Sequence, residues 1–141
     1  MALITGTRVY GSQLSLEIDG DDYAPDITNC VKKAEPDGDR TITFGDATAG
    51  EVHKHYLEIT AVQSTDADSW WSFCNDNVGQ QFAFQHAQHA NATPTANQPH
   101  ITGTLEITAP PELGVEAGRK KTGVFTMRCD IIGEPVVDRG A

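Results

Sequence analysis

The chain has 141 residues, of which 38% are hydrophobic, and this is the size and composition of one ordinary globular domain. Ten Lys and Arg residues stand against 20 Asp and Glu residues, so the formal net charge is −10. That balance argues against tight direct binding to nucleic acid, because proteins of that class carry a basic stripe. No apolar run approaches the roughly 20 residues that cross a bilayer, so we expect no membrane segment.

Alternation of apolar and polar residues predicts four extended segments in the first half of the chain, separated by turns. They are Leu14–Ile18, Ile27–Lys33, Thr41–Phe44 and Val52–Gln63. The stretch at about 33–51 contains Pro-Asp-Gly and further glycines, which predict a long loop around a short extended middle. We expect one domain over 1–141, with flexible N-terminal and C-terminal arms.

The segment at about residues 65–78 predicts an α-helix. Thr65 is the expected N-cap, and Gly79 is placed to end the helix. Trp70, Trp71 and Cys74 lie on one amphipathic stripe that continues to Val78, so we expect them to pack the helix onto the sheet.

The second half predicts three more strands and two loops. The strands are Gln80–His86, Ile101–Ile107 and Phe125–Ile131, and Gly133-Glu134-Pro135 is expected to end the last one. Ala87–Pro99 and Leu113–Thr122 are the predicted loops. Many strands with one helix predict a mainly β fold, an antiparallel β-sandwich or barrel-like domain with one flanking helix.

Chemistry-bearing residues form no recognisable catalytic pattern. The five histidines, at positions 53, 55, 86, 89 and 100, lack acidic partners and signature spacing, so a histidine-metal enzyme is a minor alternative. Cys30, Cys74 and Cys129 are widely spaced and form no CxxC or zinc pattern. Cys74 and Cys129 lie on apolar faces, so we expect them to be buried free thiols, which fits assembly in a reducing cytoplasm. No phosphate-binding or nucleophile motif occurs. We expect no enzyme, no metal and no cofactor.

Two stretches carry a family resemblance: Trp71–Gly79, WSFCNDNVG, and Asn91–Gly103, NATPTANQPHITG. They resemble the tail tube (major tail) proteins of long-tailed bacteriophages, especially phages of actinobacteria, and the likeness extends over about Val52–Pro135. The resemblance implies a structural virion protein, assembled in the host cytoplasm, whose hexameric rings stack into a hollow tail tube. Phage DNA would pass through the lumen without specific binding. Its other implied partners are the tape measure, tail tip and terminator proteins.

Within that family picture, an acidic lumen would repel phosphate and let DNA slide. Glu58, Glu106 and Asp130, on the polar faces of three predicted strands, are the candidate lumen-lining residues. Arg128 on the same pattern would need an acidic neighbour. The family places an inter-ring contact in the long loop, which gives five candidates here: Pro36, Asp37, Gly38, Asp39 and Phe44.

Two alternatives remain open at this stage. A tail terminator or head–tail connector would form one ring and would not polymerise. A β-sandwich module for carbohydrate or receptor binding would use the Ala87–Pro99 loop and a tryptophan. Fold alone does not decide between these functions.

Overall fold

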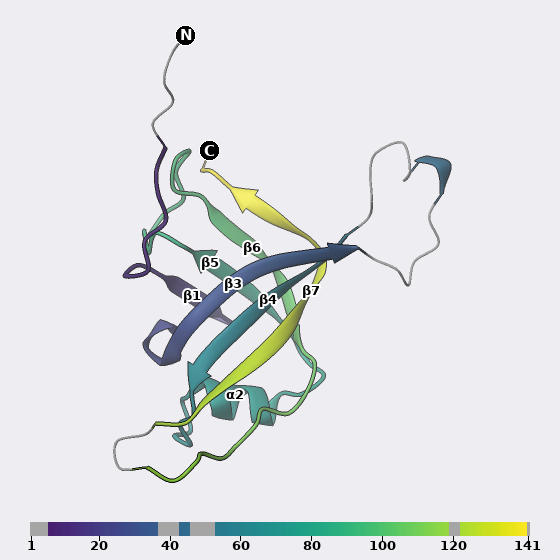
Figure 1. Cartoon of the computed structure of the whole chain (residues 1–141). Helices are drawn as coiled ribbons and strands as arrows, with labels where there is room; N and C mark the ends of the chain where they lie inside the picture. The colour runs from purple at the N-terminus through teal and green to yellow at the C-terminus, as the bar shows by residue number, and fades with distance from the viewer. Residues whose placement is uncertain (1–5, 37–42, 46–52, 119–121, 141) are drawn as a thin grey trace.

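The computed structural model describes residues 6–36, 43–45, 53–118 and 122–140 (Figure 1). Seven antiparallel strands form one sheet in the order β2-β1-β5-β6-β7-β4-β3. The elements along the chain are β1 (Ser15–Ile18), β2 (Asp21–Asp22), the 3-10 helix η1 (Ala24–Asp26), β3 (Ile27–Pro36), β4 (His53–Val62), α2 (Trp70–Asp76), β5 (Gln81–Ala87), β6 (His100–Ile107) and β7 (Val124–Asp138).

The predicted mainly β, antiparallel fold with a flanking helix is confirmed. The sheet curls into a half-barrel, with β3, β4 and the first part of β7 on one side and β1 and β5 on the other (Figure 1). Helix α2 lies at one end of the curled sheet. No helix of the described residues is both long and apolar enough to span a membrane.

The core lies on the concave face of the sheet. Alternate residues of the strands point inward, as the period-2 pattern predicts. The fully buried side chains include an aliphatic layer contributed by β1, β4 and β6: Leu16, Ile18, Leu57, Ile59, Leu105 and Ile107. Because the sheet curls around this layer, its concave face alone provides a hydrophobic core.

An aromatic cluster joins α2 to the sheet. Trp70 is fully buried, and its ring stacks on Phe73 with centroids 5.6 Å apart. Tyr23, just before η1, lies 5.2 Å from Trp70 and 5.4 Å from Phe73, centroid to centroid. Phe73 in turn lies 4.8 Å from Phe82 of β5. The short helix is therefore held by ring packing more than by its own length.

Helix α2 begins at Trp70, five residues later than predicted, because Ser69 and not Thr65 is its N-cap. The Ser69 hydroxyl accepts a hydrogen bond from the Ser72 amide at 3.2 Å and donates to the Ser64 carbonyl at 2.6 Å. Residues 66–69 form turns instead of helix. Gly79 has the predicted positive φ of 83°, yet the helix has already ended at Asp76.

Strand β7 runs on to Asp138, so the prediction that Gly133-Glu134-Pro135 ends it is wrong. The register with β6 shifts here, from Thr104↔Ile132 to Thr102↔Val136, so three β7 residues lie opposite Gly103. Gly133 has a φ of +75°, which glycine adopts at low cost. A β-bulge tolerates proline because the ladder is already interrupted there.

The hairpin of β3 and β4 is longer than predicted. Their ladder extends to the pair Pro36↔His53, so residues 33–36, predicted as loop, belong to β3. Phe44 stands in a helical turn, which corrects the extended segment predicted at Thr41–Phe44. Thr41 and Ile42 lie outside the described residues.

Candidate assembly surface on the outer face of the sheet

The three candidate lumen residues lie on one face of three neighbouring strands. Glu106 of β6 is directly opposite Asp130 of β7, and Asp130 is opposite Tyr56 of β4. Glu58, two residues after Tyr56, therefore points to the same side, away from the core. The structure brings the three carboxylates onto one outer surface of the sheet.

Two cations on this face are held by carboxylates. Lys33 Nζ lies 2.9 Å from Glu58 Oε2. Arg128 Nε donates to Asp130 Oδ1 at 3.0 Å, and its terminal nitrogens donate to Glu35. The Arg128 guanidinium carbon also lies 3.9 Å from the Tyr56 ring centroid. Arg128 thus has the acidic neighbours that an acidic surface requires of it.

These contacts favour the charged forms of both bases. The hydrogen bond that Lys33 donates to Glu58 raises the pKa of Lys33, and the hydrogen bonds that Arg128 donates to Glu35 and then to Asp130 raise the pKa of Arg128. Because the side chains are about 40% exposed, solvent screens the pairs and they add little to stability. What the pairs do provide is an anionic partner for both Lys33 and Arg128.

The surface is mildly acidic. On β3, β4, β6 and β7 the register places Glu35, Glu58, Glu106 and Asp130 on this face with Lys33, Lys54 and Arg128. Within the described residues no ion pair involves Glu106. Other carboxylates gather elsewhere, around η1 and α2, so the net charge of the chain overstates the acidity of this face.

β3 forms a long open edge of the sheet. It has ten residues and, within the described part of the chain, pairs with β4 alone. At the opposite edge β2 has two residues and β1 has four. An unpaired edge presents a row of backbone N–H and C=O groups that pair readily with another chain. Val31, midway along β3, is 38% exposed on the outer face.

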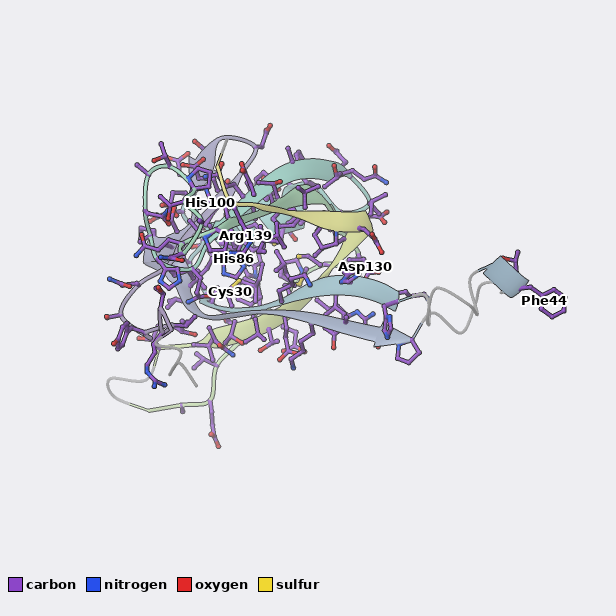
Figure 2. The ribbon with its side chains drawn as sticks, turned by 90° about the horizontal axis from the view of Figure 1, so that it is seen from above. Cys30, Phe44, His86, His100, Asp130 and Arg139 are labelled. Atoms are coloured by element: carbon purple, nitrogen blue, oxygen red, sulfur yellow. The ribbon has the colours of Figure 1, made fainter. Side chains whose placement is uncertain are left out.

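Two of the five inter-ring candidates lie within the described residues. Pro36 is the last residue of β3. Phe44 is 95% exposed and lies well beyond the end of the β3–β4 hairpin (Figure 2). Asp37, Gly38 and Asp39 lie outside the described residues.

The helix-packing candidates differ in burial. Trp70 and Cys74 are fully buried, whereas Trp71 is half-buried and its Nε1 donates to the Glu112 carbonyl at 2.9 Å.

Burial raises the pKa of the Cys129 and Cys30 thiols to about 12, and raises that of Cys74 as well. All three thiols are therefore protonated at neutral pH.

Sequence reasoning missed the role of two histidines. His100, 1% exposed, is 2.8 Å from Gln85 Nε2 through Nδ1 and 3.0 Å from the Asn91 carbonyl through Nε2. It thereby fastens the 88–99 loop to the sheet. His86 is also buried and contacts Gln88 at 2.9 Å. Among the described residues no group of three or more His, Cys, Asp or Glu could hold a metal ion.

Comparison with known proteins adds no relatives to this picture. No protein-family model matches the chain. No curated protein matches it significantly either. The resemblance to tail tube proteins therefore stays a prediction that experiment must test.

Proposed function

We propose that this chain is a structural protein of a phage virion that assembles into hexameric rings, which stack into a hollow tail tube for DNA passage. The observation that carries the proposal is the ten-residue open edge of β3 on a half-barrel sheet. Joining such sheets edge to edge would close a larger barrel and leave no edge exposed. The tape measure, tail tip and terminator proteins would then be its partners in the tail.

The charge of the outer face supports a passive lumen. Lys33 and Arg128 are engaged by carboxylates, so neither would neutralise a phosphate without losing its present partner. Tight binding of DNA depends on such neutralisation and the counterions it releases. A lumen lined by Glu58, Glu106 and Asp130 would let DNA pass without holding it.

The long hairpin supports stacking of rings. β3 ends at Pro36 and β4 begins at His53, and Phe44 between them lies beyond the rest of the sheet and is 95% exposed (Figure 2). A contact of Phe44 with the next ring would bury that side chain and link rings along the tube axis.

Electron microscopy of the purified chain across concentration tests the proposal. Hollow tubes or stacked rings are the expected result. Single rings that never stack would favour the terminator or connector alternative, and glycan-dependent changes of Trp fluorescence in a monomer would favour the binding module.

Proline variants of β3 then test the edge itself. N–H groups of successive residues in an edge strand point alternately toward the neighbouring strand and outward, so Val31→Pro and Lys32→Pro differ in which one they remove. One of the two variants loses the N–H that points away from β4, into the open edge. That variant keeps its fold by circular dichroism and fails to assemble. Assembly of both folded variants at the wild-type concentration contradicts edge pairing.

A further inference from the structure

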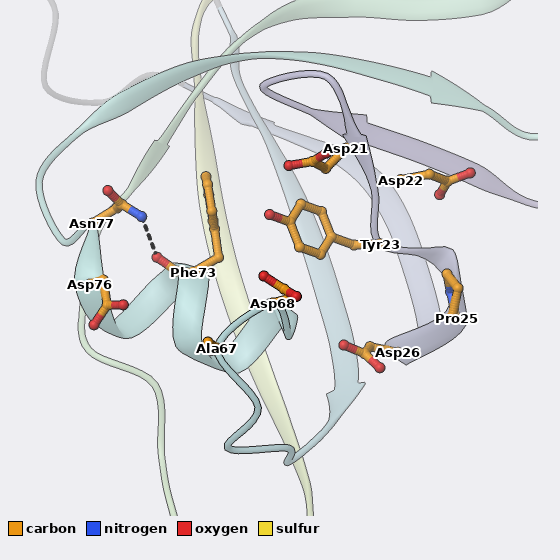
Figure 3. A pocket seen from close by; sticks show the side chains of 10 residues that line it. All are labelled: Asp21, Asp22, Tyr23, Pro25, Asp26, Ala67, Asp68, Phe73, Asp76 and Asn77. Carbon is orange, nitrogen blue, oxygen red and sulfur yellow. Dashed lines mark hydrogen bonds between the residues drawn. The ribbon is translucent and has the colours of Figure 1, made fainter.

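A concave pocket lies between the β2–η1 segment and helix α2, at the end of the curled sheet where α2 lies (Figure 1 and Figure 3). Its volume is about 580 Å³, a size suited to a small molecule or one long side chain. The lining combines aromatic rings and carboxylates, with Tyr23, Phe73, Asp21 and Asp68 central to the argument.

Tyr23 points its hydroxyl into this pocket. The residue is 8% exposed, and its ring packs at a tilt against both Trp70 and Phe73. Figure 3 shows the hydroxyl directed at the middle of the pocket, with the carboxylates of Asp21 and Asp68 on either side of it. Within the described part of the chain this hydroxyl has no hydrogen-bond partner. The ring is buried while the hydroxyl faces the pocket, so its oxygen is available to a group that enters there.

Besides Asp76, the carboxylates of the pocket fall into two groups. Asp22 and Asp26 accept hydrogen bonds from the backbone, at 2.9 Å from the Ala24 amide and 3.1 Å from the Trp70 amide. They therefore hold β2, η1 and α2 together. No hydrogen bond or ion pair among the described residues uses Asp21 or Asp68, so these two carboxylates are available to a cation.

The electrostatics of Tyr23 agree with this geometry. Burial, followed by the charge of Asp21, raises the pKa of the Tyr23 hydroxyl to about 12. The hydroxyl is thus neutral at pH 7, and its oxygen can accept a hydrogen bond from an N–H donor. Negative charge nearby favours a cationic donor over a neutral one.

We propose that this pocket binds an organic cation with a primary ammonium group, which donates hydrogen bonds to Tyr23 Oη and to the carboxylates of Asp21 and Asp68. The Phe73 ring then packs against the alkyl part of the ligand. Ring faces attract organic ammonium groups, and no set of three ligands for a metal ion occurs among the described residues. This inference does not depend on the proposed assembly.

Isothermal titration calorimetry with 1,4-diaminobutane, Nα-acetyl-lysinamide and MgCl₂ tests it. Saturable one-to-one binding of at least one amine, not displaced by millimolar Mg²⁺, is expected. Tighter binding of the diamine identifies a free polyamine as the ligand class, and tighter binding of the lysine amide identifies a protein side chain. Binding of Mg²⁺ alone, or no saturable binding of either amine, overturns the proposal.

Variants locate the binding. Asp21→Asn with Asp68→Asn weakens amine binding about tenfold or more, and Tyr23→Phe weakens it roughly threefold to tenfold, the usual effects of lost hydrogen bonds to a charged group. The control, Glu106→Gln with Glu112→Gln, removes the same charge elsewhere. Equal loss in pocket and control variants reveals non-specific attraction and overturns the site. Circular dichroism verifies that each variant is folded.

Discussion

Replacing Gly103 by alanine tests the close approach of β6 to Phe84 and Pro135 at the β-bulge. Gly103 of β6 is opposite Phe84 of β5, and on its other side β7 passes through Gly133–Pro135. A Cβ at Gly103 would lie 3.1 Å from Phe84 Cε1, 3.5 Å from Phe84 Cζ and 3.7 Å from the Pro135 Cα. Carbon atoms prefer separations of about 3.5–4.0 Å, so the first contact is repulsive.

The magnitude follows from two opposing effects. Overpacking in a well-packed core costs about 1–3 kcal/mol, and Phe84, 3% exposed, has little room to move. Alanine restricts the unfolded chain and returns about 0.4–1 kcal/mol. The net loss is about 1–2 kcal/mol. For a domain of this length the melting temperature then falls by roughly 3–8 °C.

Thermal and urea unfolding measure this loss, with two companion variants. Gly11→Ala is the matched control, because nothing lies within 4 Å of a Cβ there, and it does not lower the melting temperature, since only the effect of alanine on the unfolded chain remains. Phe84→Leu shortens the opposing ring, so Gly103→Ala costs less in that background by about 1 kcal/mol. A Gly103→Ala protein as stable as wild type, or strictly additive effects of the two substitutions, refutes the close approach at the bulge.

The remaining predictions concern the thiols, an acid-sensitive histidine and the helix cap. Because burial raises the pKa of Cys30 and Cys129 to about 12, a thiol reagent at pH 8 labels the folded protein slowly and all three cysteines at once in urea. Rapid labelling of Cys74 or Cys129 in the folded state contradicts their buried placement. Burial lowers the pKa of His86 from 6.5, so below that pH the unfolded state binds a proton more readily than the folded state. The contribution of His86 to stability is therefore complete above pH 6.5 and falls as the pH drops below it. Urea midpoints measured from about pH 5 to 7.5 show this dependence of stability on pH, and His86→Gln reduces it. Ser69→Ala removes the N-cap and lowers the free energy of unfolding by about 1 kcal/mol, whereas Thr65→Ala leaves it within about 0.5 kcal/mol; the reverse order contradicts the observed helix start.

The sequence predicts most strands because their alternation reports directly on burial. The Val52–Gln63 pattern corresponds to β4, where Leu57, Ile59 and Ala61 are fully buried. The helix start is missed for a local reason: Ser69 and Thr65 are both good N-caps, and hydrogen bonds from Ser69 and Ser72 hold residues 66–69 in turns. The hydrophobic pattern of the sequence therefore does not decide whether Thr65 or Ser69 caps the helix.

The end of β7 is missed for a tertiary reason. Gly133 and Pro135 normally interrupt a strand, but β6 supplies Gly103 at the matching position, and the bulge absorbs both residues. Likewise, the pocket around Tyr23 joins residues 21–26 to residues 67–77, and no sequence pattern links those two segments. Features made by two distant segments need the fold before they can be seen.

The carboxylates discussed above lie in two separate regions, the outer face of the sheet and the pocket beside α2. On the outer face, carboxylates are matched by Lys33 and Arg128, so the surface is only mildly acidic. Around α2, Asp21 and Asp68 have no cationic partner among the described residues, which concentrates negative potential in a concave, partly aromatic site. In the proposed tube, therefore, repulsion of DNA would depend on the few unpaired carboxylates such as Glu106, and recognition of a cation would occur at the α2 end. The two proposed functions use different faces, so we expect substitutions in one to leave the other intact.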